Sequence, residues 1–383
     1  MTRVLVAWEQ GEGLGHIGAL GGILGRLPRH VELVAAVKDA ERAAAWFPER
    51  TRFVDVPRWQ RFAAPRTVTF GDVLYGIGWF DPGHLAEQVA WWRRTLRRSR
   101  ADVVLADTCP TLLLAARGSE RPIVNVSGPW GCPTGGHPMQ PVFPDASAAD
   151  RAAAHERERA IVAACNAVVP EAPLDGLADL WAPHHFFVKG PALTDPFAGR
   201  RAASVTHLGP MGVSVGGADT DYPPGQGRRV FAYLKGHYPA LHDVLDTLAG
   251  GTGPALAVVV GHREVRRGPL RVTPTPVKLG PLLDRTDLVV THSIVGTGYL
   301  ALQASVPVLL LPTHTEQLAN ARKASELPGV GWLAPGAVRR ELRPLLASFL
   351  QPQARLEAAA TRRELTDWPD PFARVAQAVL EAA

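Results

Sequence analysis

Short apolar runs alternate with helix-like segments along the first half of the chain. Runs of this length, bounded by turn residues, are typical of strands buried on both faces of a parallel sheet. They occupy residues 3–8, 31–37, 101–107 and 121–127. The segments between them predict helices at 17–27, 39–47 and 111–118. This order of elements predicts an α/β fold in which helices cover both faces of the sheet.

The second half repeats the pattern, with strand-like runs at 228–234, 254–260, 286–292 and 306–312. A stretch rich in glycine and proline separates the two halves and is typical of a linker. We therefore expect a first domain at 1–205, a linker at 206–227 and a second domain at 228–367. The tail at 368–383 carries apolar residues on one helical face, which predicts a helix that docks on another part of the chain.

Composition fits two ordinary globular domains. The chain has 383 residues, of which 46% are hydrophobic and 20% charged. The basic stretch at 91–100 is typical of the solvated face of an amphipathic helix, and without a recognised binding motif we expect no nucleic-acid partner. The three cysteines form no CxxC pair, so we expect a reducing cytoplasm and no disulfide framework or zinc knuckle. With no signal peptide at its start and no long apolar run, the chain is expected to have no integral membrane segment.

A glycine-rich turn follows the first predicted strand. Residues 13–18 match the GxGxxG pattern, and Asp39 lies near the end of the second strand, where a dinucleotide site needs an acid. This pattern keeps an NAD-dependent oxidoreductase open as one function. The glycines of the following helix also have a structural explanation, because they allow a helix to pack closely on a sheet.

A histidine and an aspartate stand where two of the predicted strands end. His16 follows the first strand and Asp107 closes the strand at 101–107. Open α/β sheets bind ligands at the carboxyl ends of their strands. If the two strands are neighbours, Asp107 can orient the imidazole of His16, which then accepts a proton from a substrate hydroxyl. The structural alternatives are a buried core histidine and an aspartate, or Thr108, that caps the next helix.

The segment 291–331 combines two features of a sugar-nucleotide site. A strand ends at His292, and a loop with Gly296 and Thr297 then opens a helix, which favours phosphate. Glu316 and Gln317 follow the next strand, in a predicted loop at the same edge of the sheet. Phosphate binding at one loop and hydroxyl contacts at the next suggest a sugar nucleotide.

This segment resembles the donor motif of nucleotide-sugar-dependent glycosyltransferases of the GT-B fold, in particular the antibiotic and macrolide glycosyltransferases. The matching positions are His292, Gly296, Thr297, Ala301, Leu302, Val306, Pro307, Pro312, Gln317, Asn320, Ala321, Gly329 and Gly331. The stretch at 13–20 looks like the family's turn that carries the catalytic histidine, and the stretch at 102–110 looks like the strand that carries its aspartate partner. The stretch at 207–212 resembles the interdomain segment, so the resemblance covers most of the chain in the right order.

The resemblance implies two Rossmann-like domains facing across a cleft, with the tail helix crossing back to the first domain. It implies metal-independent, inverting transfer of a sugar from a nucleoside diphosphate, such as UDP or dTDP, to a hydroxyl or other nucleophile of a small acceptor such as a natural product. His16 is then the base and Asp107 its partner. The expected donor contacts are Gly15, Gly236, His292, Ser293, Gly296, Thr297, Glu316 and Gln317. No cofactor and no metal are expected, and the oligomeric state stays open, a homodimer included.

Aromatic residues of the first domain are candidates for an apolar acceptor pocket. These are Trp79, Phe80 and Trp130. The alternative is that they belong to the hydrophobic core.

Several positions depart from the family's motif. Ser293 and Ile294 stand in place of two glycines, and Leu300 stands in place of a glutamate that commonly holds the ribose hydroxyls. Glu316 stands in place of the usual aspartate. These departures leave open a catalytically altered accessory protein or a sugar-nucleotide epimerase of the same fold.

Overall fold

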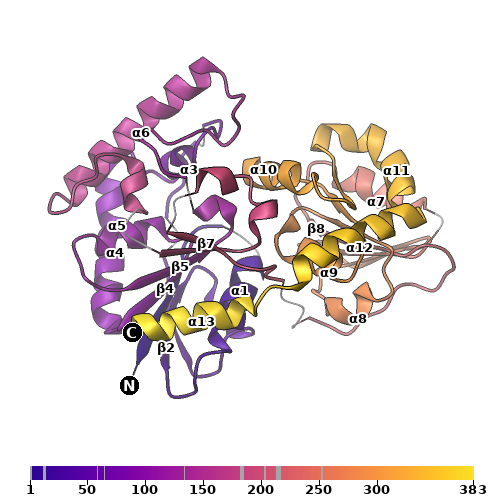
Figure 1. Ribbon diagram of the computed structural model, residues 1–383, viewed down its shortest axis with the longest axis horizontal. Helices are drawn as coiled ribbons and strands as arrows, with labels where there is room; N and C mark the ends of the chain where they lie inside the picture. The colour runs from indigo at the N-terminus through magenta and orange to yellow at the C-terminus, as the bar shows by residue number, and fades with distance from the viewer. Residues whose placement is uncertain are drawn as a thin grey trace. The chain divides into compact units, whose positions relative to one another are not determined.

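The computed structural model describes residues 2–383 except 12–13, 58, 64, 133, 182–184, 202–203, 213–216 and 252. The chain divides into two compact units (Figure 1). The first comprises Met1–Lys189, Phe197–Leu208 and Asp370–Ala383, and the second comprises Gly190–Pro196 and Gly209–Pro369. Among the described residues, no helix has the length and apolar character needed to cross a membrane.

The first unit is built on a seven-stranded sheet in the order β3-β2-β1-β4-β5-β6-β7, in which every neighbouring pair is parallel. Its strands are β1 (Arg3–Trp8), β2 (Glu32–Val37), β3 (Thr51–Asp55), β4 (Val103–Asp107), β5 (Ile123–Ser127), β6 (His185–Val188) and β7 (Val205–His207). The four apolar runs that the sequence marked are confirmed as β1, β2, β4 and β5. The strands that the pattern missed are short or carry charged residues, because they lie toward the edges of the sheet.

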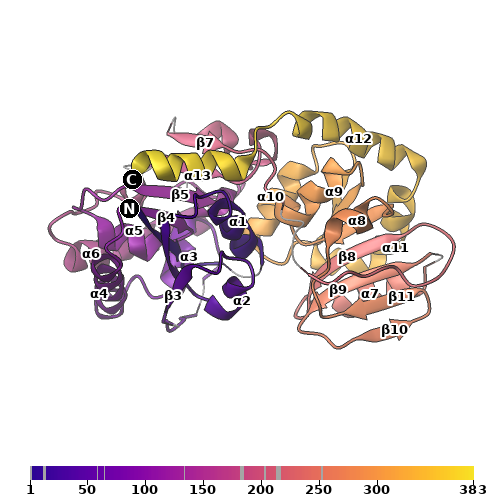
Figure 2. The same ribbon diagram turned by 90° about the horizontal axis from the view of Figure 1, so that it is seen from below.

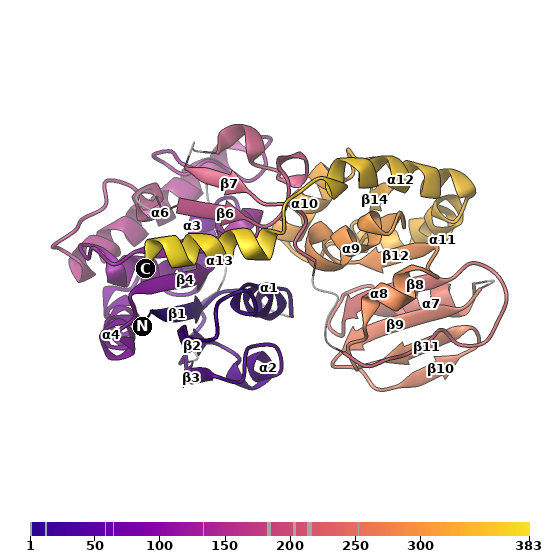
Figure 3. The same cartoon turned by 60° about the horizontal axis from the view of Figure 1, so that its bottom comes forward.

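Helices cover both faces of this sheet (Figures 1 and 2). They are α1 (Leu14–Leu24), α2 (Ala40–Ala44), α3 (Phe70–Gly76), α4 (Pro82–Ser99), α5 (Pro110–Ala116), α6 (Ala148–Val168) and α13 (Pro371–Ala382), with 3-10 turns η1 (Pro129–Gly131), η2 (Leu177–Leu180) and η4 (Ala198–Arg200). The helix predicted at 39–47 is shorter than expected, and the one predicted at 17–27 begins three residues earlier and ends at Leu24. The C-terminal helix α13 lies beside α1 and along β4 and β5 (Figure 3).

Two glycines of α1 make room for neighbours other than the sheet. A Cβ on Gly22 would lie 2.6 Å from the ring of Phe372 on α13, and a Cβ on Gly21 would lie 2.6 Å from the carbonyl oxygen of Trp46. A side chain at either position would require Phe372 or the Trp46 backbone to shift. The explanation drawn from the sequence, that these glycines bring the helix close to the sheet, is therefore wrong for this pair.

The second unit is also built on a seven-stranded sheet, in the order β10-β11-β9-β8-β12-β13-β14, and only the β10–β11 pair among its described strands is antiparallel. Its strands are β8 (Val230–Lys235), β9 (Ala255–Val260), β10 (Val265–Arg267), β11 (Leu270–Thr273), β12 (Leu288–Thr291), β13 (Val308–Leu310) and β14 (Val330–Trp332). Its helices and turns are η3 (Ala192–Thr194), α7 (Leu241–Ala249), α8 (Leu279–Leu283), η5 (Ile294–Gly298), α9 (Tyr299–Gln303), α10 (Thr315–Ala324), η6 (Pro335–Ala337), α11 (Val338–Phe349) and α12 (Pro352–Thr366).

The connections differ in detail from the expected boundaries. The segment predicted as a linker begins inside β7, and the tail helix begins at Pro371 rather than at 368. The segment Gly190–Pro196 belongs to the second unit although it lies within the range predicted for the first. One reason is a buried hydrogen bond, 2.6 Å long, between the hydroxyls of Thr194 and Tyr299.

Candidate active site

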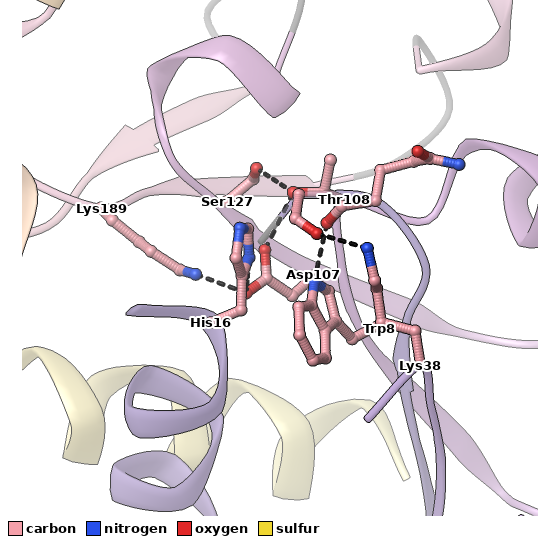
Figure 4. A network of polar contacts seen from close by, with 9 residues as sticks. Trp8, His16, Lys38, Asp107, Thr108, Ser127 and Lys189 are labelled. Carbon is pink, nitrogen blue, oxygen red and sulfur yellow. Dashed lines mark hydrogen bonds and ion pairs between the residues drawn. The ribbon is translucent and has the colours of Figure 1, made fainter. Parts of the chain in front are cut away.

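His16 and Asp107 come together at the carboxyl edge of the first sheet. Trp8 and Asp107 are paired positions at the ends of the neighbouring strands β1 and β4. His16 lies in the first turn of α1, just beyond β1. Its Nδ1 is 2.9 Å from Oδ2 of Asp107 (Figure 4). Asp107 is completely buried, whereas 21% of the His16 side chain is exposed.

A third charged residue, which the sequence reading missed, completes this group. Lys189 follows β6 directly, and its Nζ lies 2.5 Å from the same Oδ2 of Asp107 (Figure 4). Its side chain is only 4% exposed. The sequence does place a lysine directly after the apolar run Phe186–Val188. Lys189 could have been expected at the sheet edge only if this run had been predicted as a strand.

These contacts fix the charge of Asp107. Burial alone would raise the pKa of this carboxyl, but the charges and hydrogen bonds of His16 and Lys189 outweigh burial and hold its pKa well below the usual range. Asp107 is therefore ionised throughout the neutral pH range and accepts hydrogen bonds. It follows that Nδ1 of His16 carries the donated hydrogen, so that in the neutral ring the lone pair is on Nε2.

Asp107 does not cap the following helix. Its Oδ1 accepts a hydrogen bond of 3.0 Å from the hydroxyl of Thr108, which lies 2.8 Å from the hydroxyl of Ser127. The N-cap position of α5 is Cys109, and it makes no side-chain capping bond. The capping alternatives for Asp107 and Thr108 are thus wrong, because both side chains point into this hydrogen-bonded group instead.

The ring of His16 is held by stacking as well as by hydrogen bonding. Its centroid lies 5.3 Å from that of Trp8, with 19° between the planes. The Nε2 edge of the imidazole fills the space beside Gly11, where a Cβ would lie 2.3 Å from Nε2. Lys38 donates a hydrogen bond of 2.7 Å to the Gly11 carbonyl and lies over the Trp8 ring. The turn after β1 is therefore built around the imidazole.

Glu9 provides a buried carboxyl at the same edge of the sheet. It accepts hydrogen bonds from the backbone N–H of Thr111, at 3.1 Å, and from the Thr111 hydroxyl. It thereby caps the N-terminus of α5 from outside the helix. Burial raises the pKa of Glu9 to about 7, against the lowering effect of these hydrogen bonds.

In the second unit, His292 joins the ends of three neighbouring strands. It directly follows β12, its Nε2 accepts a hydrogen bond of 2.8 Å from the backbone N–H of Lys235, and its Nδ1 donates one of 2.6 Å to the carbonyl of Leu311. Burial lowers the pKa of His292 to about 4, so the ring is neutral at pH 7. Both ring nitrogens of His292 are engaged with backbone groups, and its contact with a donor stays a prediction.

The turn after His292 is shaped by Ser293 and Gly296. The Ser293 hydroxyl accepts a hydrogen bond of 3.2 Å from the backbone N–H of Val295. Gly296 has φ 87°, a backbone conformation that favours glycine. Thr297 is half-buried, and α9 beyond it has only 5 residues, so the helix predicted to favour phosphate is short.

Gly236 directly follows β8, and close packing favours a glycine at this position. A Cβ there would approach the carbonyl oxygen of Val260 to 2.7 Å, which only a glycine avoids. Gly15 is different: it lies exposed in the first turn of α1, and among the described residues nothing lies within 4 Å of an added Cβ.

Glu316 and Gln317 lie in the first turn of α10 rather than in the predicted loop. The carbonyl oxygen of the Gln317 side chain accepts hydrogen bonds from the Thr313 backbone and hydroxyl, at 2.8 and 2.7 Å. Only the amide nitrogen of Gln317 is left to contact a sugar. Leu300 packs against Gly212, where an added Cβ would lie 2.4 Å from its Cγ.

The three aromatic candidates have different surroundings. Trp79 is fully buried within the hydrophobic core, which corrects its assignment to an acceptor pocket. Phe80 is half-buried and stacks on Tyr75 at 4.4 Å. Trp130 is half-buried and lies 5.9 Å from the ring of Phe70.

The part of the chain that the structure describes contains no group of three or more histidine, cysteine, aspartate or glutamate side chains arranged to hold a metal ion. No protein-family model matches the chain. The glycosyltransferase of kitacinnamycin superimposes with a TM-score of 0.71 at 17% identity, covering 99% of this chain and 98% of that one. The spinosyn rhamnosyltransferase SpnG complexed with thymidine diphosphate gives a TM-score of 0.67 at 18% identity, covering 99% and 100%.

The chain has the GT-B fold. The likeness extends over both units, which confirms the fold expected from the donor-motif resemblance. In sequence, the chain is 42% identical over 65 residues to demethyllactenocin mycarosyltransferase of Streptomyces fradiae. That match spans 17% of this chain and 14% of the length of that relative.

Proposed function

We propose that this GT-B protein is an inverting glycosyltransferase that moves a sugar from a nucleoside diphosphate to a hydroxyl group of a small natural product, without a metal ion. The observation that carries the proposal is the hydrogen bond between His16 and the buried, ionised Asp107 at the carboxyl edge of the first sheet. This arrangement leaves Nε2 of His16 as a base.

The chemistry follows from that geometry. His16 Nε2 removes the proton of the acceptor hydroxyl while its oxygen forms a bond to the anomeric carbon of the sugar. The bond from that carbon to the diphosphate oxygen breaks, and the nucleoside diphosphate leaves with the electron pair. Attack on the face opposite the leaving group inverts the configuration. Asp107 holds the imidazole in the required tautomer and stabilises the imidazolium that forms.

The proposed donor is a sugar linked to thymidine diphosphate. The support for the nucleotide is the similar structure of SpnG, which is complexed with thymidine diphosphate. The short sequence match to a mycarosyltransferase supports transfer of a sugar. We assign the diphosphate to the backbone around Gly296 and Thr297, and the sugar hydroxyls to Glu316 and the Gln317 amide nitrogen. Leu300 offers no hydrogen bond to a ribose, so a donor with a deoxyribose fits this position better than one with a ribose.

We propose that the acceptor is an apolar molecule that packs against aromatic side chains. Phe80 and Trp130 are half-buried aromatic side chains of the first unit, and their rings offer apolar contact area. A small natural product with one free hydroxyl fits this chemistry.

Thermal-shift measurements with dTDP, UDP, ADP, GDP and NAD⁺ test the donor assignment. A ligand that binds only the folded state raises Tm in proportion to ln(1 + [L]/Kd). We expect the largest shift with dTDP. A shift with NAD⁺ alone would favour the oxidoreductase instead. Two contacts disfavour that alternative: the imidazole of His16 fills the turn beside Gly11, and Asp39 caps α2 through the N–H of Arg42. Gly13, the first glycine of that pattern, lies outside the described residues.

A transfer assay with the variant His16→Ala tests the reaction. We expect dTDP binding to persist and sugar transfer to fall by about 10²- to 10⁴-fold. Unchanged sugar transfer by His16→Ala would overturn the role of His16 as the base, and absence of transfer by the wild type despite dTDP binding would support an accessory role. Conversion of the donor sugar in the absence of any acceptor would support an epimerase.

A further inference from the structure

In the first unit, a ring nitrogen of His16 and the ammonium group of Lys189 contact the same carboxylate oxygen of Asp107. Oδ2 of Asp107 lies 2.9 Å from Nδ1 of His16 and 2.5 Å from Nζ of Lys189. The lysine reaches this oxygen from the end of β6, which is separated from β4 by β5 in the sheet. Its backbone is fixed there, because its N–H donates a hydrogen bond of 2.8 Å to the carbonyl of Ser127.

We propose that Lys189 is a positioning residue that sets the proton affinity of the catalytic base, by holding a fixed positive charge on the carboxylate that orients His16. The inference rests on the proposed function for the role of His16, but the electrostatic claim concerns the three side chains alone.

The charge balance explains the effect. With Lys189 protonated and Asp107 ionised, the pair is neutral, and a neutral His16 leaves the buried group without net charge. Protonation of His16 then adds a second cation to a carboxylate that is already paired, which lowers the proton affinity of the imidazole. The base therefore stays unprotonated, and ready to accept the acceptor proton, at lower pH than a simple His–Asp pair would allow.

The other ionisable groups near His16 have no described hydrogen bond to the Asp107 carboxylate. Lys38, from the end of β2, donates to the Gly11 carbonyl rather than to Asp107. Glu9, from the end of β1, is bound to Thr111. Cys109 is buried, and its pKa is raised well above the usual value by burial and by the nearby carboxylates of Glu9 and Asp107, so it is neutral.

Further charged residues lie on α13 and α2, the helices packed beside α1. Arg374 and Glu381 on α13 and Glu41 and Arg42 on α2 are exposed, and Arg26, which follows α1, pairs with Asp370. None of these six has a described contact with Asp107.

A role in stability alone does not explain why a lysine stands at this position. Burying an ammonium group requires desolvation, which apolar residues of similar size avoid. Asp107 already accepts hydrogen bonds from His16 and, on its other oxygen, from Thr108. What only the lysine adds is a permanent positive charge.

The test is an NMR titration of the His16 imidazole in the variants Lys189→Met and Lys38→Met, with labelled histidine. We expect the titration midpoint in Lys189→Met to rise by about one pH unit or more, because one buried charge has been removed. Lys38→Met removes a lysine charge at the same sheet edge without touching Asp107, and its shift should be smaller. Equal midpoints in the wild type and Lys189→Met would overturn the proposal.

A second pair of variants keeps the test decisive if Lys189→Met does not fold. Asp107→Asn leaves the lysine charge unpaired beside His16, and Asp107→Asn/Lys189→Met removes it. The proposal requires a His16 midpoint at least about one pH unit higher in the double variant. These titrations need no substrate, so failure of the glycosyltransferase assignment would not affect them. If transfer activity is found, the acidic limb of kcat/KM in Lys189→Met should move to higher pH together with the NMR midpoint.

Discussion

Lys189 binds Asp107, which lies 82 residues earlier in the sequence. Lys189 directly follows β6 and Asp107 ends β4, and β5 lies between these two strands in the sheet. Both side chains are almost completely buried. Removing one member of such a pair leaves the other charge buried and unpaired, which destabilises proteins more than removing both.

Asp107→Asn should therefore lower the free energy of unfolding by about 3–5 kcal/mol. The double variant Asp107→Asn/Lys189→Met should be destabilised by less than the sum of the two single variants, because it leaves no unpaired charge. Denaturant unfolding of the wild type and the three variants measures this cycle. Additive effects would show that the two side chains are not energetically coupled.

Glu9 should make the first unit less stable as the pH rises toward neutrality. Its folded-state pKa is about 7, above its ordinary value of 4.5, so the folded form binds more protons between these values. The associated stability is complete below pH 4.5 and is lost as the pH rises through 7. The change amounts to about 3 kcal/mol at most.

The variant Glu9→Gln should remove this pH dependence while keeping an oxygen for the N–H of Thr111. Unfolding measured from pH 5 to 8 compares the two proteins, with Glu41→Gln as a control on the exposed helix α2. A Glu9→Gln profile that runs parallel to the wild type would contradict the prediction.

His292 should make the second unit more stable as the pH rises, which is opposite to the effect of Glu9 on the first unit. Its folded-state pKa of about 4 lies below its ordinary value of 6.5. The stability it contributes is complete above pH 6.5 and is lost as the pH falls through 4, since the unfolded chain binds the proton more tightly. Gln is neutral at all pH values, so His292→Gln should flatten this slope.

His292→Gln should also weaken the junction of the three strand ends by about 1–3 kcal/mol, because one of the two hydrogen bonds is lost. When the two units unfold in a single transition, the opposite effects of Glu9 and His292 below pH 6.5 make the wild-type stability profile flatter than that of Glu9→Gln, which keeps the histidine slope. A variant at His242, on α7, serves as the control.

Gly236→Ala should destabilise the second unit by about 1–3 kcal/mol. The added methyl group would lie 2.7 Å from the Val260 carbonyl oxygen, and backbone atoms on both sides must move to accept it. Gly280→Ala in α8 is the matched control, because among the described residues nothing lies within 4 Å of its added Cβ. Equal melting temperatures for the two variants would show that the strand ends adjust freely.

The sequence by itself determined the class of fold and two members of the site. A strand buried on both faces must be apolar throughout, so the runs that became β1, β2, β4 and β5 are visible without any structure. The carboxyl ends of parallel strands meet at one edge, and this placed His16 and Asp107 together once β1 and β4 were taken as neighbours. The donor-motif resemblance added the expectation of a GT-B fold.

Only the tertiary structure decided which side chains share partners. It brought Lys189 to Asp107, gave both nitrogens of His292 to backbone groups, and set Phe372 against Gly22. It also placed Trp79 in the core. These contacts join residues far apart in the chain, and they depend on the order of strands and the packing of helices. Hydrophobic periodicity records which face of an element is buried, but it does not record what lies against that face.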